Sequence, residues 1–541
     1  MVTSPADGRS DLYTGGAVYS AAIVEAFQRF PEREAFVLGD RRMTFAEGAA
    51  SMSRIQQVLA ELGIGHGGAV GALSVNLPEV WLTQAATYLL GGRYTGLHPL
   101  GSVDDHVWIC DDAEIEVLVV HPHFAAAGRQ ILERASTVRH LLVFGESEVG
   151  EDLSAAMSRH EPRPLEPGPA GPEDIAWLQY TGGTTGRPKG VMLPQRAMVE
   201  LARAGLSAWQ LPTHPRYLVA PPITHAGVMP LFPTLARGGT VVLLQGFEPA
   251  SFLRTIEQER VNVTLVVPTM IYALLDHTAP GEHDLSSLEV MLYGAAPIAP
   301  GRLSEALERF GRKLVQLYGQ TECAGITTSL LREEHDPVDR PELLTSCGRP
   351  ALGTKVAVLD ESDREVPPGT PGEICVRSQA VMSGYWKLPD LTAETLRDGW
   401  LHTGDIGIRD EEGFLHIVDR KKDMIITGGF NVFPKEIENV LSGHLDVASV
   451  AVVGRPDPKW GEAVTAYVVP RPGAELDGEE LKDLVKRAKG AHQTPKDVVV
   501  LDALPMTLVG KIDKKKLRAL DVPQVAPTGG TAAPRPPGSS P

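Results

Sequence analysis

The 541-residue sequence has little cysteine and no long apolar segment. Its 4 cysteines, Cys110, Cys323, Cys347 and Cys375, form no CxxC pair and no other spacing typical of metal ligands. We therefore expect neither a disulfide scaffold nor a zinc site, and the composition suits a reducing compartment. No apolar run approaches the roughly 20 residues that a membrane-spanning helix needs, and residues 1–13 lack the apolar core of a signal peptide. The expectation is a cytoplasmic protein without a transmembrane segment.

Basic residues are also fewer than acidic residues. The sequence contains 51 Lys and Arg against 68 Asp and Glu, so its formal net charge is -17. An acidic surface repels phosphate backbones, which argues against a nucleic-acid partner. A nucleotide substrate would have to be met by a local cluster of donors. The 43% hydrophobic content is ordinary for a globular chain of this length and allows more than one domain.

The first part of the chain has the sequence pattern of an α/β domain. From about residue 43 to residue 300, short apolar runs alternate with helical stretches such as Ala250–Glu259. This alternation predicts mostly parallel sheets covered by helices, with ligands beyond the carboxyl ends of the strands. The runs expected to be strands are Val117–Val120, Thr240–Leu244 and Val263–Val267.

The texture changes after about residue 346. Glycine and proline punctuate short strands there, which predicts a small, barrel-like antiparallel region. A second pattern of strands and helices follows a charged run that ends at Asp423 and continues to about Leu520. We expect a large N-terminal domain over residues 1–421, a small mobile α+β domain over residues 422–521 and a disordered, Pro/Gly-rich tail over residues 522–541.

A glycine- and threonine-rich loop follows the apolar run 175–178. Its sequence is Tyr-Thr-Gly-Gly-Thr-Thr-Gly-Arg-Pro-Lys-Gly over residues 180–190. Glycines allow backbone N–H groups to surround an anion, threonine hydroxyls add donors and Lys189 adds charge. The loop is not a Walker A motif, because Lys189 precedes glycine rather than Ser or Thr. Its expected phosphate-binding residues are Thr181, Gly182, Gly183, Thr184, Thr185, Gly186 and Lys189.

This loop resembles the phosphate loop of the adenylate-forming superfamily, which includes acyl-CoA synthetases, adenylation domains of peptide synthetases and firefly luciferase. Gly182 stands where many members have serine. Further motifs in the family's order extend the resemblance from about Phe27 to Leu520. It implies that Thr184, Lys189, Glu322 and Lys511 serve catalysis, with Lys511 bridging the carboxylate and the α-phosphate during adenylation. Lys514 to Lys516, which follow it, read as solvated surface.

Two segments that follow strands resemble the family's adenine and metal motifs. Small residues after the strand Leu288–Tyr293 let a planar ring approach the backbone, and the resemblance puts this segment against the adenine. A carboxylate near phosphates suits Mg²⁺, which takes oxygen ligands. The resemblance makes Glu322 that ligand, puts Thr321 on the phosphate and stacks Tyr318 on the adenine. The expected nucleotide contacts are Gly294, Ala295, Ala296, Pro297, Tyr318, Gly319, Gln320, Thr321 and Glu322.

The remaining motifs concern the ribose, the hinge and coenzyme A. A carboxylate can accept two hydrogen bonds from ribose hydroxyls, and the resemblance gives this role to Asp405, with Arg420 on ribose or phosphate. It makes Lys422 the hinge about which the small domain rotates. It places Gly428, Gly429 and Phe430 along the pantetheine arm of coenzyme A. Trp460 has two interpretations, a coenzyme A contact or a core residue.

The acyl-binding residues follow only from alignment to the family. His225 is interpreted either as a gate to the acyl group or as a core histidine. The set is mostly apolar and offers no charge to an α-amino group, which favours aromatic, fatty or polycyclic acids over amino acids. Its members are His225, Val228, Met229, Tyr272, Tyr293, Gly319, Gly325 and Ile326.

The resemblance implies an ATP-dependent acid–thiol ligase that uses Mg²⁺ and passes its acyl group to coenzyme A. Its expected partners are a small carboxylic acid, ATP and coenzyme A, and a homodimer is left open. Three alternatives stay open. The enzyme loads a carrier protein, or it activates another acid, even an inorganic one, for transfer to an amine. Third, the chain is an inactive homologue that only binds ligands, which the presence of Lys511, Glu322, Asp405 and Arg420 disfavours.

Overall fold

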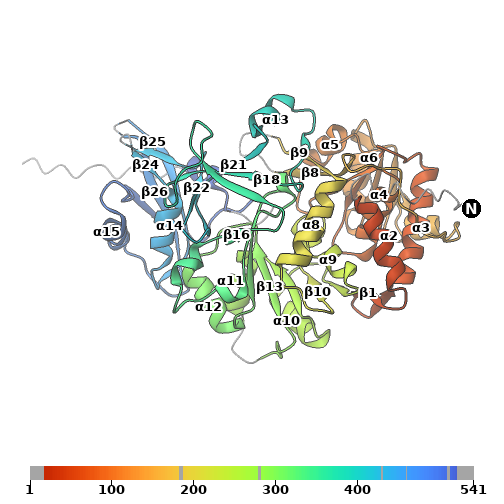
Figure 1. Cartoon of the computed structure of the whole chain (residues 1–541), viewed down its shortest axis with the longest axis horizontal. Helices are drawn as coiled ribbons and strands as arrows, with labels where there is room; N and C mark the ends of the chain where they lie inside the picture. The colour runs from red at the N-terminus through yellow and green to blue at the C-terminus, as the bar shows by residue number, and fades with distance from the viewer. Residues whose placement is uncertain are drawn as a thin grey trace, which may run out of the picture. The chain divides into compact units, whose positions relative to one another are not determined.

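The computed structural model describes residues 18–181, 187–277, 282–427, 430–458, 460–507 and 512–520. Their contacts divide the chain into two compact units. Residues up to Met424 form the first unit, and residues 425–507 together with residues from Ile512 form the second. Each unit is described by itself below (Figure 1). Among the described residues, no helix combines the length and the apolar character needed to cross a bilayer.

The first unit contains a mixed sheet of strand order β16-β15-β14-β13-β12-β10-β11-β1-β2. Its central pairs are parallel, whereas β2, β15 and β16 add antiparallel edges. The expectation of parallel sheets is therefore confirmed for the centre of this sheet. Its strands are β1 (Glu34–Leu38), β2 (Arg41–Thr44), β10 (Arg216–Val219), β11 (Thr240–Leu243), β12 (Val263–Val266), β13 (Val290–Gly294), β14 (Leu314–Tyr318), β15 (Thr328–Leu330) and β16 (Arg349–Pro350).

A second sheet of the same unit has the order β19-β9-β8-β4-β3-β5-β6-β7. The strands β3 to β7 pair in parallel, and β8 and β9 form an antiparallel pair that flanks the phosphate loop. Its strands are β3 (Ala69–Leu73), β4 (Arg93–Leu97), β5 (Val117–Val120), β6 (His140–Val143), β7 (Glu151–Asp152), β8 (Ile175–Thr181), β9 (Lys189–Pro194) and β19 (Gly384–Tyr385).

Helices cover these two sheets because their apolar residues recur on one face. In α10 (Pro249–Gln258), Phe252, Leu253 and Ile256 are buried, and each contributes about 1.5–3 kcal/mol by leaving water. The helix α3 (Phe45–Glu61) begins at a capping box of Thr44 and Glu47. The other helices are α2 (Tyr19–Arg29), α4 (Pro78–Leu89), α5 (Val103–Asp112), α6 (Ala125–Arg134), α7 (Leu153–Met157), α8 (Gln195–Ala208), α9 (Leu231–Ala236), α11 (Pro268–His277), α12 (Pro300–Phe310) and α13 (Pro389–Thr395).

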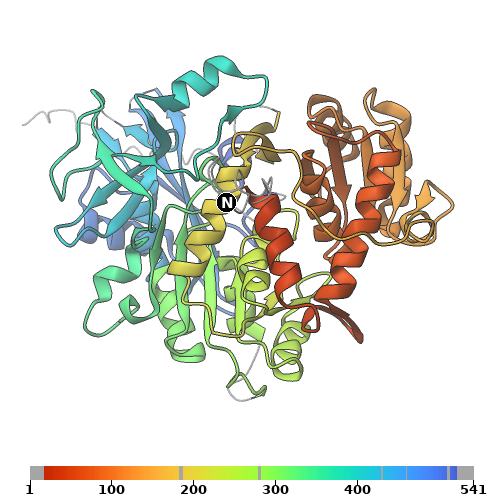
Figure 2. The ribbon, with the colours of Figure 1, turned by 45° about the vertical axis from the view of Figure 1, so that its right-hand side comes forward.

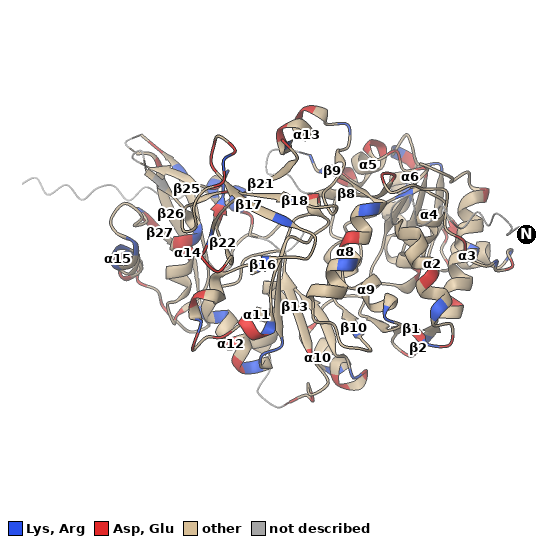
Figure 3. Ribbon diagram, viewed as in Figure 1, with Lys and Arg blue, Asp and Glu red and all other residues tan. Residues whose placement is uncertain are grey.

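The helix α2 joins segments that lie far apart in the sequence. It contacts α3 and α4 on one side and α8 and α9 on the other, and Figure 2 shows the red helix beside the yellow one. The backbone N–H of Ser20 donates to the side chain of Gln195 at the start of α8, and both residues are buried. The charges on this surface are intermixed, since blue and red positions alternate along α8 (Figure 3).

The third sheet of the first unit is antiparallel, as the glycine- and proline-rich texture predicts. Its order is β17-β18-β21-β20, with β22 paired to β21. It holds the two residues expected at the ribose. Its strands are β17 (Lys355–Leu359), β18 (Gly372–Arg377), β20 (Leu396–Arg397), β21 (Trp400–Arg409) and β22 (Leu415–Arg420).

The second unit is an α+β domain with its own core. Its sheet has the order β24-β23-β26-β25, and β27 pairs with β26 in parallel. Apolar residues of the sheet and of two helices form a separate cluster. The elements are β23 (Ile425–Thr427), β24 (Phe430–Val432), α14 (Pro434–Ser442), β25 (Val447–Asp457), β26 (Gly461–Pro470), α15 (Gly478–Lys489), β27 (Asp497–Val500) and α16 (Lys514–Ala519).

Candidate active site

The two ends of the phosphate loop lie opposite each other. Thr181 ends β8, Lys189 begins β9, and the two residues are direct partners in the antiparallel ladder. The ladder therefore holds the two ends of the loop together. The expected contacts Gly182, Gly183, Thr184, Thr185 and Gly186 lie outside the described residues.

The amine of Lys189 is positioned by an aromatic ring. Its Nζ lies 4.8 Å from the centre of the Tyr385 ring. Tyr385 belongs to β19, which pairs with β9. A cation over an aromatic face is attracted by the ring's quadrupole, so this contact restrains the lysine at the base of the loop.

Tyr385 also holds the carboxylate expected to bind the metal. Its hydroxyl donates a 2.7 Å hydrogen bond to Oε1 of Glu322, and Glu322 is buried. Burial and the neighbouring Glu322 charge raise the pKa of Tyr385, so its hydroxyl remains a donor. The backbone carbonyl of Glu322 accepts from the N–H of Met382. The sequence analysis missed Tyr385, because a two-residue strand leaves no periodic signal.

Asp405 is the best-anchored carboxylate of the site. It is 3% exposed, its Oδ2 accepts a 2.8 Å hydrogen bond from the hydroxyl of Tyr318, and its Oδ1 lies 3.0 Å from Nε of Arg420. Asp405 and Arg420 are register partners on β21 and β22. The cross-strand ladder thus explains why two residues 15 positions apart meet.

Three cations surround these carboxylates. Burial lowers the pKa of Lys422, and the charges of Arg420 and Lys189 lower it further. Burial also acts to lower the pKa of Arg420, but the charges of Asp405 and Glu322 outweigh this and raise it. Lys422 is therefore within electrostatic reach of both Arg420 and Lys189. This local positive cluster is what an acidic chain needs to hold a polyphosphate.

The adenine segment is exposed at the carboxyl end of β13. Ala295 and Pro297 are exposed, and Ala295 has a left-handed φ of 66°. The Tyr318–Gln320 segment folds onto residues 325–327, since the N–H of Gly325 donates to the carbonyl of Gln320. A Cβ at Gly319 would lie 2.5 Å from the carbonyl carbon of Gly325, so this contact requires glycine. Thr321 opens a short 3₁₀ turn that carries Glu322.

The expected acyl-binding residues divide into two groups. Val228, Met229 and Ile326 belong to one core cluster or pack against it, and a Cβ at Gly325 would lie 2.8 Å from Cε of Met229. Tyr272 and Tyr293 belong to another cluster. The hydroxyl of Tyr293 is bonded to Nε2 of buried His335, and that of Tyr272 accepts from the N–H of Ala299. The structure therefore does not bring the two tyrosines together with the other acyl candidates.

His225 is partly buried beside a second histidine that the sequence analysis missed. Its ring meets that of His98 edge to face, with centroids 4.7 Å apart, and its Nδ1 lies 3.0 Å from Oγ1 of Thr224. Burial and the neighbouring His98 lower the pKa of His225 to about 3. Both rings are thus neutral near pH 7, and His225 offers no charge to a substrate.

A cavity of about 460 Å³ lies near α13 rather than among the acyl candidates. Tyr385 lines it, together with Met192 and Leu388. None of the residues that the sequence predicts at the acyl group lines this cavity. It therefore gives no support to that set.

In the second unit, the residues expected at coenzyme A are exposed. Phe430 is 61% and Trp460 is 38% exposed, which excludes the core interpretation of Trp460. The Nζ of Lys496 lies 4.9 Å from the Trp460 ring centre. Gly428, Gly429 and the catalytic candidate Lys511 lie outside the described residues.

The expectation of a fully solvated lysine run after Lys511 is wrong for Lys514. Its Nζ forms a 2.8 Å ion pair with Oε1 of Glu438, and the two side chains are 21% and 12% exposed. Glu438 also accepts from the backbone N–H of Val452. The pair ties α16 to α14 and β25, which the sequence could not show because 76 positions separate the two residues.

Known proteins resemble this chain in sequence and in fold. The family model described as AMP-binding enzyme matches residues 23–386, and the model described as AMP-binding enzyme C-terminal domain matches residues 436–511. The chain is 45% identical to a medium/long-chain-fatty-acid–CoA ligase of Mycobacterium tuberculosis over 92% of this chain and 89% of that protein. It is 38% identical to a feruloyl-CoA synthase of an Amycolatopsis species over 90% and 96% of the two chains.

A solved structure agrees with these matches. The amide bond synthetase of Marinactinospora thermotolerans superposes with a TM-score of 0.85 at 36% identity, over 92% of this chain and 99% of that one. The chain belongs to the adenylate-forming superfamily of AMP-binding enzymes, in its acyl-CoA synthetase branch. It is an ATP-dependent, AMP-forming acid–thiol ligase.

Proposed function

We propose that this ligase activates an apolar monocarboxylic acid, fatty or arylic, and that coenzyme A accepts the acyl group. The observation that carries the proposal is the ion pair of Asp405 with Arg420, together with Glu322, which Tyr385 holds, and the neighbouring cations Lys189 and Lys422. These carboxylates and cations together can bind a nucleoside triphosphate at both its ribose and its phosphates. The acyl candidates outside this set carry no charge.

The first half-reaction brings two anions together. The substrate carboxylate attacks the α-phosphate of ATP, and pyrophosphate leaves. Lys189, the loop threonines and Lys511 would offset the negative charge on the phosphates and hold the reacting groups in line. Asp405 would accept hydrogen bonds from the ribose hydroxyls and so fix the nucleotide's position. Ala295 and Ala296 would lie against the adenine, with Tyr318 stacked on it.

Magnesium fits the donor chemistry at Glu322. Mg²⁺ prefers oxygen ligands and keeps several waters and phosphate oxygens, so one protein carboxylate is enough. Glu322 is buried and already oriented by Tyr385. When bound, the ion would neutralise phosphate charge. Tyr385 and Met382 would hold the Glu322 side chain and backbone, respectively, whether or not the ion is present.

The second half-reaction transfers the acyl group to a thiol, and AMP leaves. For this step we propose that the small domain rotates about Lys422, withdrawing Lys511 and presenting Gly429. Gly428, Gly429, Phe430 and Trp460 would then line the path of the pantetheine arm. The division between the compact units at Met424 and Ile425, two residues after Lys422, supports a hinge there.

The acid is inferred from neutral surroundings and from relatives. Val228, Met229 and Ile326 are apolar, and His225 and His98 are uncharged near pH 7. The relatives named above act on medium- or long-chain fatty acids and on ferulate. We assign Tyr272 and Tyr293 a lesser part, because their hydroxyls are bonded within another cluster.

A pyrophosphate-release screen tests the proposal. Purified enzyme is given ATP, Mg²⁺ and a panel of fatty, aryl and amino acids, with coenzyme A, with a simple amine or with neither. The proposal expects turnover with apolar acids that rises with coenzyme A and yields thioester. Amide formation without coenzyme A would favour the chemistry named for the amide bond synthetase. Turnover confined to amino acids would contradict the proposed acid class.

A further inference from the structure

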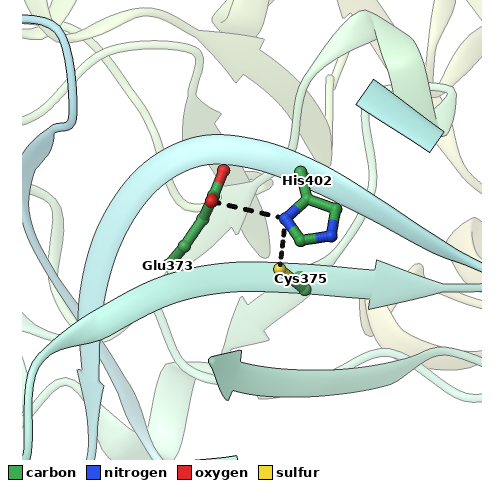
Figure 4. Close-up of side chains that lie close together, drawn as sticks. All are labelled: Glu373, Cys375 and His402. Carbon is green, nitrogen blue, oxygen red and sulfur yellow. Dashed lines mark hydrogen bonds and ion pairs between the residues drawn. The ribbon is translucent and has the colours of Figure 1, made fainter. Parts of the chain in front are cut away.

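A thiol, an imidazole and a carboxylate converge between the strands β18 and β21, the second of which also carries Asp405. Glu373 and Cys375 are two positions apart on β18 and share one face, and His402 is the register partner of Cys375 on β21. Figure 4 shows the three side chains pointing toward one another. No local sequence pattern indicates this cluster, because 27 positions separate Cys375 from His402 and the cysteines have no metal-ligand spacing.

Two distances within this cluster match those between ligands of one metal ion. The Nδ1 of His402 lies 3.3 Å from Sγ of Cys375 and 3.3 Å from Oε2 of Glu373. Tetrahedral zinc with bonds of about 2.3 Å to sulfur and about 2.0–2.2 Å to nitrogen and oxygen holds such ligand atoms about 3.3–3.6 Å apart. All three donor atoms lie within 4.8 Å of one another.

The hydrogen bonds within this cluster do not satisfy both ring nitrogens of His402. Cys375 is fully buried, and Nδ1 of His402 is approached both by its thiol and by Nη2 of Arg397, the latter at 2.9 Å. Within the described part of the chain, the buried Nε2 of His402 has no hydrogen-bond partner, and Oδ1 of Asp363 lies 3.9 Å from it. A metal on Nδ1 would fix the ring proton on Nε2, the nitrogen nearest to Asp363, in the manner of a carboxylate–histidine–metal arrangement.

We propose that Glu373, Cys375 and His402 bind a divalent ion of the zinc class, with water completing the tetrahedron. Thiolate and imidazole select such ions over Mg²⁺, which favours oxygen ligands alone. Binding exchanges the S–H bond for an S–metal bond, and the thiol proton leaves to solvent. Cys375 would have to lose that proton against burial and the charges of Glu373 and Asp363, which raise its pKa to about 12. Metal binding therefore strengthens as pH rises.

Two cations oppose binding, and both side chains are exposed enough to move aside. Nζ of Lys421 lies 3.4 Å from Oε2 of Glu373, and Arg397 occupies the side of Nδ1. The Arg397 side chain is 42% exposed and already paired with Asp363 at 3.2 Å, so it can leave the imidazole and keep that partner. Oε1 of Glu373 accepts from the N–H of Gly404, next to Asp405, and a metal on Oε2 leaves that bond intact.

The test uses the full chain, freed of metal by a chelator that is then removed, and titrates Co²⁺ in excess Mg²⁺. We expect a thiolate-to-cobalt charge-transfer band that saturates at one equivalent, is displaced by Zn²⁺ and is accompanied by release of one proton. Cys375→Ser should abolish the band, whereas Cys110→Ser, which removes a buried thiol from helix α5, should keep it. Arg397→Ala should tighten binding, by up to about fivefold, as expected for removal of an exposed competing contact.

Several results would overturn the proposal. Absence of the band in the folded wild-type protein means that the cluster is a hydrogen-bonded packing contact. A band that persists in Cys375→Ser comes from another thiol. Should Cys375→Ser fold poorly, Glu373→Gln provides a second variant, in which Co²⁺ affinity must fall at least tenfold. None of these results depends on the acid or acceptor of the ligase.

Discussion

The hydroxyl of Tyr385 donates a 2.7 Å hydrogen bond to Oε1 of Glu322, and the same tyrosine ring lies under the amine of Lys189. One side chain thus positions both a proposed metal ligand and a phosphate-loop cation. The strand pair β9–β19 fixes this geometry, since Tyr385 is the register partner of Val191. Tyr385 is therefore a positioning residue. The contribution of its hydroxyl, which holds Glu322, can be separated by mutation from that of its ring, which contacts Lys189.

The first prediction concerns Tyr385→Phe. The ring beneath Lys189 remains, but Glu322 loses its donor. A hydrogen bond to a charged group contributes about 1.5–3 kcal/mol, so we expect adenylation to slow about tenfold or more and to need more Mg²⁺. Pyrophosphate release measured over a range of Mg²⁺ concentrations checks this. Glu322→Ala should show a larger loss. An unchanged Mg²⁺ dependence in both variants would remove Glu322 from the metal site.

A second prediction concerns Asp405→Asn. The buried carboxylate pairs with Arg420 and accepts from Tyr318, and the amide cannot serve both partners and a ribose. We expect the KM for ATP to rise at least tenfold. Tyr318→Phe, the matched variant, leaves the charge pair and should raise KM by a smaller factor. Equal effects of both variants on thermal stability, with KM unaltered, would assign Asp405 a structural role only.

A third prediction concerns acid stability and buried His335. Its Nδ1 lies 2.7 Å from the carbonyl of Leu331, so Nδ1 donates and Nε2 accepts from Tyr293. Burial lowers the pKa of His335 to about 4, below the value of about 6.5 in the unfolded chain. Between pH 4 and pH 6.5, His335 is protonated in the unfolded chain but neutral in the folded chain. Stability is therefore intact above pH 6.5 and falls by up to about 1.4 kcal/mol per pH unit as the pH drops toward 4.

Unfolding by urea at pH 8 and pH 5 measures this effect. His335→Gln should lower stability at pH 8, because the packing changes, but should reduce the loss between the two pH values. His214→Gln, at an exposed position, should leave that loss unchanged. If His335→Gln keeps the full acid loss, other groups, His225 among them, account for it.

How far the sequence predicts this molecule depends on the range of each contact. The strand Val117–Val120 has the predicted bounds, because its local apolar run sets them. The order of the strands in the sheets is a long-range property that no local pattern carries. Asp405 and Arg420 could be selected as ligands by motif, yet their direct pairing depends on the register of β21 and β22.

Other parts of the site lie beyond such reasoning. Tyr385 and His98 have no motif, and only packing places them at Lys189 and His225. The resemblance puts Tyr293, which directly precedes the adenine segment, among the acyl-binding residues. Alternation along β13 puts its side chain in a different core cluster from Leu292, toward His335. A residue's position next to a motif does not determine the face of the sheet on which its side chain lies.

A fourth prediction concerns Lys511→Ala. Its place at the end of the second family match motivates the role of bridging carboxylate and α-phosphate. Adenylation should fall by at least a hundredfold while ATP still binds, since Asp405 and Arg420 remain. Preformed acyl-adenylate should still yield thioester. Lys515→Ala, on the exposed side of α16, is the matched control and should retain both steps. Near wild-type adenylation in Lys511→Ala would exclude the bridging role.

The last prediction concerns Lys422 and the two half-reactions. Residues 420–424 form a turn in which the N–H groups of Asp423 and Met424 donate to the carbonyl of Arg420, and the compact units divide directly after it. Proline fixes φ near about −65°, so Lys422→Pro should restrict any rotation about this turn. The substitution also removes a cation from the site, which Lys422→Ala reproduces without the restraint.

We therefore expect Lys422→Ala to weaken ATP binding only modestly and to affect both steps alike. Lys422→Pro should show the same change in adenylation, and a further loss of at least tenfold in transfer to coenzyme A. Rapid-quench measurements of each step, with acyl-adenylate supplied for the second, separate these effects. If both variants lose the two steps in parallel, Lys422 acts through its charge, and rotation occurs about another residue or is not needed. A loss confined to thioester formation in Lys422→Pro identifies this turn as the hinge, because only the backbone restraint distinguishes the two variants.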